Sequence, residues 1–121
     1  MKTQIISFNC WDNNNFSIDF SQEYQHYCHL YQIGNFNQLS DSQSIVILKN
    51  FINDFRLGKI SLDILCALCY ELYFNSNFSN PKSKLSPYEN LLLSLTELSF
   101  DIRNNPLYAG ETLTKAFKDL S

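Results

Sequence analysis

The segment from Ser61 to Phe74 constrains the fold most, because it is apolar on almost every side. Only Asp63 and Glu71 carry charge within it. A helix without a polar face has to be surrounded by other elements, because apolar side chains on every side of it must be buried. Its apolar residues are Leu62, Ile64, Leu65, Cys66, Leu68, Cys69, Leu72, Tyr73 and Phe74. We therefore expect residues 62–74 to form the central helix of a bundle.

The residues just before this segment predict a second helix that packs directly against it. From Asp41 or Ser42 to Leu57, apolar side chains recur at the spacing of one helix face. They are Ile45, Leu48, Phe51, Ile52 and Phe55. Gly58 fits the position just after a helix end, and Ser61 can cap the next helix. Because the connection is so short, the two helices have to be neighbours.

The C-terminal half predicts two further helices. Ser86, Pro87 and Glu89 match a capping box with a proline in the first turn, which predicts one helix from Ser86 to about Asn104. A short helix from about residue 111 to residue 120 closes the chain. The stretch 75–85 between these helices and the central one is rich in Ser and Asn, and we expect it to be an exposed loop.

The first forty residues contain weaker signals. Residues 21–33 favour a helix, with Gly34 just past its end, while the alternation of Phe16, Ile18 and Phe20 favours a strand. We prefer one short extended piece, within residues 3–8, followed by a helix. The expected fold class is thus all-α: a small helical bundle of four to five helices with a short N-terminal extended segment. Its length fits a single domain, 1–121, in which 1–40 form an N-terminal extension packing on a 41–121 helical bundle.

Composition and charge exclude several classes of protein. Nine Lys and Arg against twelve Asp and Glu give a net charge of −3 and a pI near 5.2, which argues against a nucleic-acid-binding groove. No run of apolar residues is long enough to cross a bilayer, and the first residues lack the pattern of a signal peptide. We therefore expect a cytoplasmic protein that binds neither nucleic acid nor membrane.

The cysteines predict buried thiols rather than a functional site. The chain has four, Cys10, Cys28, Cys66 and Cys69, too few for a disulfide scaffold. Cys66 and Cys69 form a C-x-x-C motif, but it lies in the middle of the expected central helix and has no second ligand pair for zinc. Packing as small hydrophobic residues is the simplest interpretation.

Residues suited to catalysis are few. The three glycines are scattered, which excludes a phosphate-binding loop. His26 and His29 flank Cys28 on one helix, where neighbouring positions point in different directions. We expect one histidine to face solvent and the other to pack or to form a hydrogen bond. We therefore expect no enzyme, no cofactor and no metal. An enzymatic alternative would rely on His26, Cys28 and His29.

The placement of the charges is more informative than their sum. Residues 1–48 and 86–111 each carry a net charge of −3, while residues 49–59 carry +2. On the helix from Ser86, a polar stripe that includes Glu97 and Asp101 falls on one side. Such a stripe is either an ordinary solvated face or a surface kept acidic for a basic partner, where it would imitate phosphates.

Residues 47–120 resemble a known family. The segments that carry the resemblance are LKNFINDFRLGKISLDILCALCYELY, ENLLLSLTELSFDI with a later Pro, and ETLTKAFKDL. They are similar to bacterial colicin-D-type immunity proteins and to some immunity proteins of contact-dependent inhibition systems. The most characteristic pieces of this resemblance are Phe55 to Ser61 and Leu91 to Asp101. The chain departs from the family in its N-terminal extension of about forty residues.

The resemblance implies a small helical bundle that binds a cognate tRNA-cleaving toxin domain and covers its active site with acidic residues. It implies that Asp101 contacts the partner. To it we add Glu97, Glu89, Asp63 and Glu71 from charge placement alone. We expect a monomer that forms a heterodimer with its nuclease toxin. The alternative is a helical adaptor or regulatory module without a toxin partner, which would bind through an aromatic surface made by Tyr24, Tyr27 and Tyr31.

Overall fold

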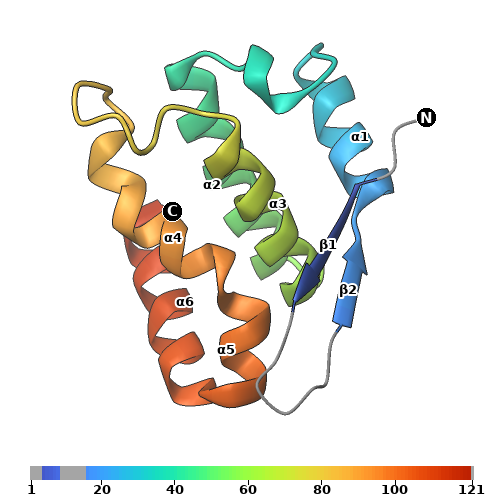
Figure 1. Cartoon of the computed structure of the whole chain (residues 1–121), viewed down its shortest axis with the longest axis vertical. Helices are drawn as coiled ribbons and strands as arrows, with labels where there is room; N and C mark the ends of the chain where they lie inside the picture. The colour runs from blue at the N-terminus through green and yellow to red at the C-terminus, as the bar shows by residue number, and fades with distance from the viewer. Residues whose placement is uncertain (1–3, 9–15, 121) are drawn as a thin grey trace.

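Helix α3 (Leu62–Phe74) lies at the centre of the molecule, as its sequence predicts. In the computed structural model, which describes residues 4–8 and 16–120, α3 contacts α2, α4, α5 and strand β2 (Figure 1). The side chain of Ser61 accepts a hydrogen bond from the backbone N–H of Ile64 and caps the helix. Its fully buried residues are Leu65, Cys66, Ala67, Leu68, Cys69 and Leu72.

Helix α2 (Asp41–Arg56) begins and ends with well-formed caps. Ser40 and Gln43 form a capping box, in which each side chain accepts a hydrogen bond from the other's backbone N–H. At the other end Gly58 has a φ of +76°, and Lys59 N–H donates to the carbonyl of Asp54 at 2.8 Å. This is a Schellman motif, so the predicted role of Gly58 is confirmed.

The N-terminal part contains one more strand than we preferred. Strands β1 (Ile5–Phe8) and β2 (Phe16–Asp19) pair antiparallel, and Ile6 lies opposite Ile18 with both side chains buried. Helix α1 (Ser21–Leu30) follows directly, so the strand and the helix are both present rather than alternatives. The helix ends three residues early, because Gln32, with a φ of 57°, takes the left-handed position that we expected near Gly34.

Aromatic side chains attach this N-terminal part to the bundle. The ring of Tyr27 lies edge-on to that of Phe51 at 4.8 Å between centroids. The fully buried Phe36, in the short 3₁₀ helix η1 (Phe36–Gln38), contacts both Tyr24 and Phe51. One continuous hydrophobic core therefore takes side chains from β1 through to the C-terminal helix.

The loop before the C-terminal helices is anchored rather than fully exposed. Phe78 and Leu85 are both 0% exposed, so our expectation of an exposed loop over residues 75–85 is wrong at these two positions. In the sequence both residues lie among serines and asparagines, and this polar composition led us to expect that the whole stretch is exposed. The 3₁₀ helix η2 (Ser86–Tyr88) comes next.

The prediction of a single helix from Ser86 to Asn104 is wrong, because the helix is interrupted at Glu97. The structure instead has α4 (Glu89–Thr96) and α5 (Leu98–Asn104), and Ser86 does not cap either of them. Helix α6 (Pro106–Leu120) also begins five residues earlier than expected, since proline is well tolerated in the first turn of a helix. The fold class is all-α as predicted, but the described part of the chain has six α-helices rather than four to five, beside one two-stranded sheet.

Candidate partner-binding surface

The outward side of α3 carries exposed aromatic rings, although the other residues of this helix are buried or half-buried. Tyr70 is 37% exposed and Phe74 is 64% exposed, and their ring centroids lie 4.6 Å apart. Tyr73 meets the Phe74 ring edge-on at 5.3 Å. One turn of helix apart, Tyr70 and Phe74 occupy the same side, which neither α2 nor α4 covers.

The outward side of α4 continues this surface with carboxylates. Glu89, Leu93 and Glu97 follow one another at intervals of four residues, so they lie on one helix face. Leu93 is 38% exposed, and Glu97 is exposed. The hydroxyl of Tyr73 donates a hydrogen bond of 3.1 Å to Glu89 Oε2 and joins the two helices. We call Tyr70, Tyr73, Phe74, Glu89, Leu93 and Glu97 the α3–α4 face.

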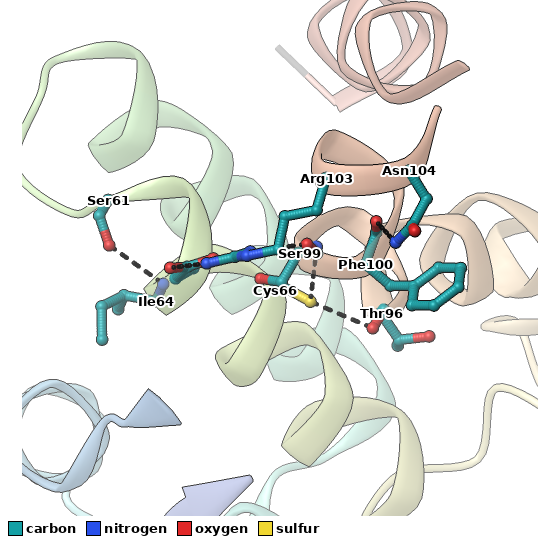
Figure 2. A network of polar contacts seen from close by, with 9 residues as sticks. Ser61, Ile64, Cys66, Thr96, Ser99, Phe100, Arg103 and Asn104 are labelled. Carbon is teal, nitrogen blue, oxygen red and sulfur yellow. Dashed lines mark hydrogen bonds and ion pairs between the residues drawn. The ribbon is translucent and has the colours of Figure 1, made fainter. Parts of the chain in front are cut away.

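A thiol from α3 forms hydrogen bonds with backbone groups on both sides of the interruption at Glu97 (Figure 2). The Cys66 thiol donates to the carbonyl of Thr96 at 3.1 Å, and the Ser99 N–H donates to Cys66 Sγ at 3.4 Å. In an unbroken helix the Ser99 N–H would donate to the carbonyl of Leu95. One buried thiol thus replaces backbone hydrogen-bond partners that a continuous helix would have supplied.

Asp101 lies inside the molecule and not on an exposed acidic stripe. Its side chain is 8% exposed, and Oδ2 has no hydrogen-bond partner among the described residues. Burial, and to a lesser degree the nearby charge of Glu97, raise the pKa of this carboxyl above its usual value of 3.8. The predicted polar stripe, with Glu97 and Asp101 on one side, assumes the angular spacing of one continuous helix. That spacing does not extend across the interruption at Glu97. The partner contact that the resemblance implies for Asp101 therefore has little exposed surface to act through.

Asp63 forms an ion pair with Arg103 that links α3 to α5. Its two oxygens accept hydrogen bonds of 3.1 Å from the two terminal nitrogens of Arg103, whose Nη1 also donates to the carbonyl of Ser99 at 2.6 Å (Figure 2). The guanidinium carbon of Arg103 lies 4.0 Å from the centroid of the Phe16 ring. Hydrogen bonding from Arg103 is the main cause that lowers the pKa of Asp63. This arrangement ties α5 to α3 and to β2.

Glu71 belongs to a different side of α3. Its carboxylate accepts a hydrogen bond of 3.2 Å from Asn75 Nδ2, and partial burial raises its pKa. Burial is the main cause that raises the pKa of Tyr24 and of Cys28, both on α1, and the charge of Glu71 adds to it. Of the five acidic residues that we selected from the sequence, only Glu89 and Glu97 therefore lie on the α3–α4 face, two helix turns apart, and the charge of Glu97 also acts on the buried Asp101.

Sequence reasoning missed the apolar part of this surface. Phe74 was counted with the apolar residues of the central helix, and Tyr70 was not singled out at all. Leu93 was grouped with the leucines of α4 that do face inward. The one available signal was the angular spacing of Asp63, Tyr70 and Phe74, which puts both rings on the side of a charged residue.

The surfaces required by the two alternative functions differ from what we expected. Tyr24 and Tyr27 are buried, so the aromatic surface of the adaptor alternative does not exist in that form. His26 and His29 are both exposed, whereas we expected one of them to pack. Cys28 is buried, and burial raises the pKa of its thiol. The three residues of the enzymatic alternative thus do not converge on one reacting point.

The other cysteines are buried as expected. Cys28, Cys66 and Cys69 are free and buried, and Cys10 lies outside the described residues. Burial raises the pKa of Cys66 and of Cys69. Within the described ranges, no group of three or more His, Cys, Asp or Glu side chains is arranged to hold a metal ion.

Comparison of the chain with family models, with curated proteins and with solved structures found no match. Among the helices of residues 4–8 and 16–120, none is long and apolar enough to span a membrane.

Proposed function

We propose that this protein binds a basic protein partner through the α3–α4 face. The observation that carries the proposal is the exposed pair Tyr70 and Phe74 next to Tyr73, whose hydroxyl bonds the carboxylate of Glu89. The exposed carboxylate of Glu97 lies two turns further along the same side of α4. Following the resemblance of residues 47–120, we further propose that the partner is a nuclease toxin domain in the cytoplasm and that the bound protein covers its active site. In that role the protein is an inhibitor and not an enzyme.

The aromatic pair is suited to anchor a complex. Buried aromatic side chains carry much of the binding energy at protein interfaces, because they remove a large area from water while few rotatable bonds are fixed. Tyr70 and Phe74 already contact each other, and Tyr73 contacts Phe74, so the rings are held before a partner arrives. Less conformational entropy is then lost on binding.

The carboxylates are suited to select a basic partner. Tyr73 holds Glu89 in place, and Glu97 lies two turns further along the same side. A nuclease cleft is lined with cations that bind phosphates, and carboxylates at the rim of an interface speed the encounter with such a surface. Because Glu97 is exposed and Glu89 is only half-buried, their contribution should weaken as salt is added.

A binding experiment with the toxin domain tests this proposal. The proposal requires a nuclease toxin gene beside the gene of this chain, and its purified nuclease domain is the probe. We expect a one-to-one complex that blocks cleavage of the nuclease's RNA substrate and weakens with salt. Phe74→Ala should weaken binding by roughly tenfold or more. Glu89→Lys with Glu97→Lys should weaken it further and flatten its salt dependence.

Matched variants outside the face make the result specific. Glu23→Lys reverses a carboxylate on α1 and should leave binding nearly unchanged. Absence of a complex at low salt would contradict the proposal, as would equal binding by the charge-reversed and unmodified proteins. Binding that depends on Phe74 but not on salt would contradict the role proposed for Glu89 and Glu97.

A further inference from the structure

The outward side of α6 forms a second surface, separate from the α3–α4 face. A shallow trough of about 680 Å³ runs along this helix. Leu107, 76% exposed, stands at one end, and Gly110 and Thr114 lie along its length. The trough is lined by Pro106, Leu107, Gly110, Glu111, Thr114, Lys115, Lys118 and Asp119. A smaller hollow between α4 and α6, with Tyr108 and Leu91, shares Glu111 and Lys115 with it.

Gly110 has no role within the folded chain that requires glycine. A Cβ atom added there would meet nothing within 4 Å, and the φ angle is not in the left-handed region. Glycine inside a helix costs about 1 kcal/mol of stability relative to alanine. The fold accepts this cost although alanine would fit. A second helix passing close over Gly110 would account for it, since a missing side chain lets two backbones approach.

The charges on this side of α6 complement their own reversed copy. Along the helix they run Glu111, Lys115, Lys118 and Asp119, two of each sign. A two-fold axis at the level of Thr112 would place Gly110 of one copy over Thr114 of the other. It would also bring Glu111 of each copy within reach of Lys115 of the other. Leu107 would then cover the turn that contains Lys118, whose aliphatic stem is apolar.

We propose that the trough on α6 is occupied by α6 of a second copy of this chain, antiparallel across a two-fold axis beside Gly110 and Thr114. Each copy offers the same surface, as a two-fold interface requires. A single helix pair is a small interface, so the dimer forms only at raised protein concentration. This differs from the monomer expected from the sequence, and it does not depend on the proposed function.

Sedimentation velocity over about 1 μM to about 1 mM protein tests this association. We expect the sedimentation coefficient to rise with concentration towards that of a dimer. Leu107→Glu should raise the dimer dissociation constant by at least tenfold. Its side chain is exposed, so the variant should fold normally, which circular dichroism and the thermal midpoint will check. Leu57→Glu, at a residue 62% exposed after α2, is the matched control and should leave the dissociation constant unchanged.

Charge exchange tests the antiparallel orientation. Glu111→Lys or Lys115→Glu alone should weaken the dimer, and the double variant should restore it. In a Cys10→Ser background, Gly110→Cys mixed with Thr114→Cys should form more disulfide-linked dimer than either variant by itself. A chain that stays monomeric throughout the range would overturn the proposal. A dimer that is indifferent to Leu107→Glu, or cross-linking that favours like pairs, would overturn it equally.

Discussion

The thiol of Cys66 and the carbonyl of Thr96 lie 3.1 Å apart, and this hydrogen bond joins the central helix to the point where α4 ends. The Ser99 N–H completes the arrangement from the other side of the break. A side chain that sequence patterns treat as a small hydrophobic residue therefore satisfies backbone groups at the point where one helix becomes two.

Substitution of Cys66 should separate its polar role from its packing role. Cys66→Val leaves the Thr96 carbonyl and the Ser99 N–H buried without a partner, which we expect to cost about 1–3 kcal/mol. Cys66→Ser keeps a donor and an acceptor and should cost less. Urea unfolding measures both. At Cys69, whose thiol makes no hydrogen bond among the described residues, the order of the two variants should reverse. The same order at both positions would contradict this role of Cys66.

The buried thiols should be unreactive in the folded protein. Burial raises the pKa of Cys28, Cys66 and Cys69, and only the thiolate attacks alkylating reagents. In a Cys10→Ser variant at pH 8, we expect slow labelling by iodoacetamide in buffer and rapid labelling at all three sites in urea. Mass spectrometry counts the added groups. Rapid labelling of any of them without denaturant would show that the site opens easily.

The ion pair of Asp63 with Arg103 should make stability depend on acid pH. The folded-state pKa of Asp63 is lowered, so its contribution is present above the unfolded value near 3.8 and is lost as pH falls through the folded value. Asp63→Asn should therefore be less stable than the unmodified protein at pH 7 and equally stable near pH 2. Both side chains are about 40% exposed, so we expect a difference of at most about 1 kcal/mol. Urea titrations at several pH values measure it.

Asp101 should show the opposite pH dependence. Its folded-state pKa is raised, so the charged form is destabilising, and stability declines as pH rises from 3.8 through the folded value. Asp101→Asn should thus gain stability relative to the unmodified protein between pH 4 and pH 7, with the advantage fading below pH 4. The readout is the thermal midpoint of each protein across this range. A constant difference at all pH values would contradict this interpretation.

Phe78 should be the main anchor of the loop over residues 75–85. It is 0% exposed, so Phe78→Ala leaves a cavity and should cost about 3–5 kcal/mol. Phe74→Ala, on the exposed side of α3, should change the free energy of unfolding by well under half of that. The two variants thus remove the same side chain from a buried and an exposed position. Comparable losses of stability in urea would show that Phe74 is not an exposed binding residue.

The parts of the fold that follow from local spacing could be predicted, and those that depend on distant partners could not. Helices α2 and α3 and the turn at Gly58 follow from apolar spacing and from a residue suited to a positive φ. The interruption at Glu97 does not, because the group that satisfies its backbone atoms, the Cys66 thiol, lies about thirty residues earlier. The charges of the candidate surface were visible in the sequence. Which of them face solvent was decided by that break and by the pairing of Asp63 with Arg103.

The division of residues 89–104 into two short helices has a consequence for the order of folding. Helices of eight and seven residues are too short to persist alone in water, because nucleation costs more than so few backbone hydrogen bonds return. They can form only on a surface that already exists, and Cys66 on α3 is part of that surface. We therefore expect Glu89 and Glu97 to take their places beside α3 only after α3 has formed. A newly made chain, or one that has partly opened, has no α3–α4 face to offer.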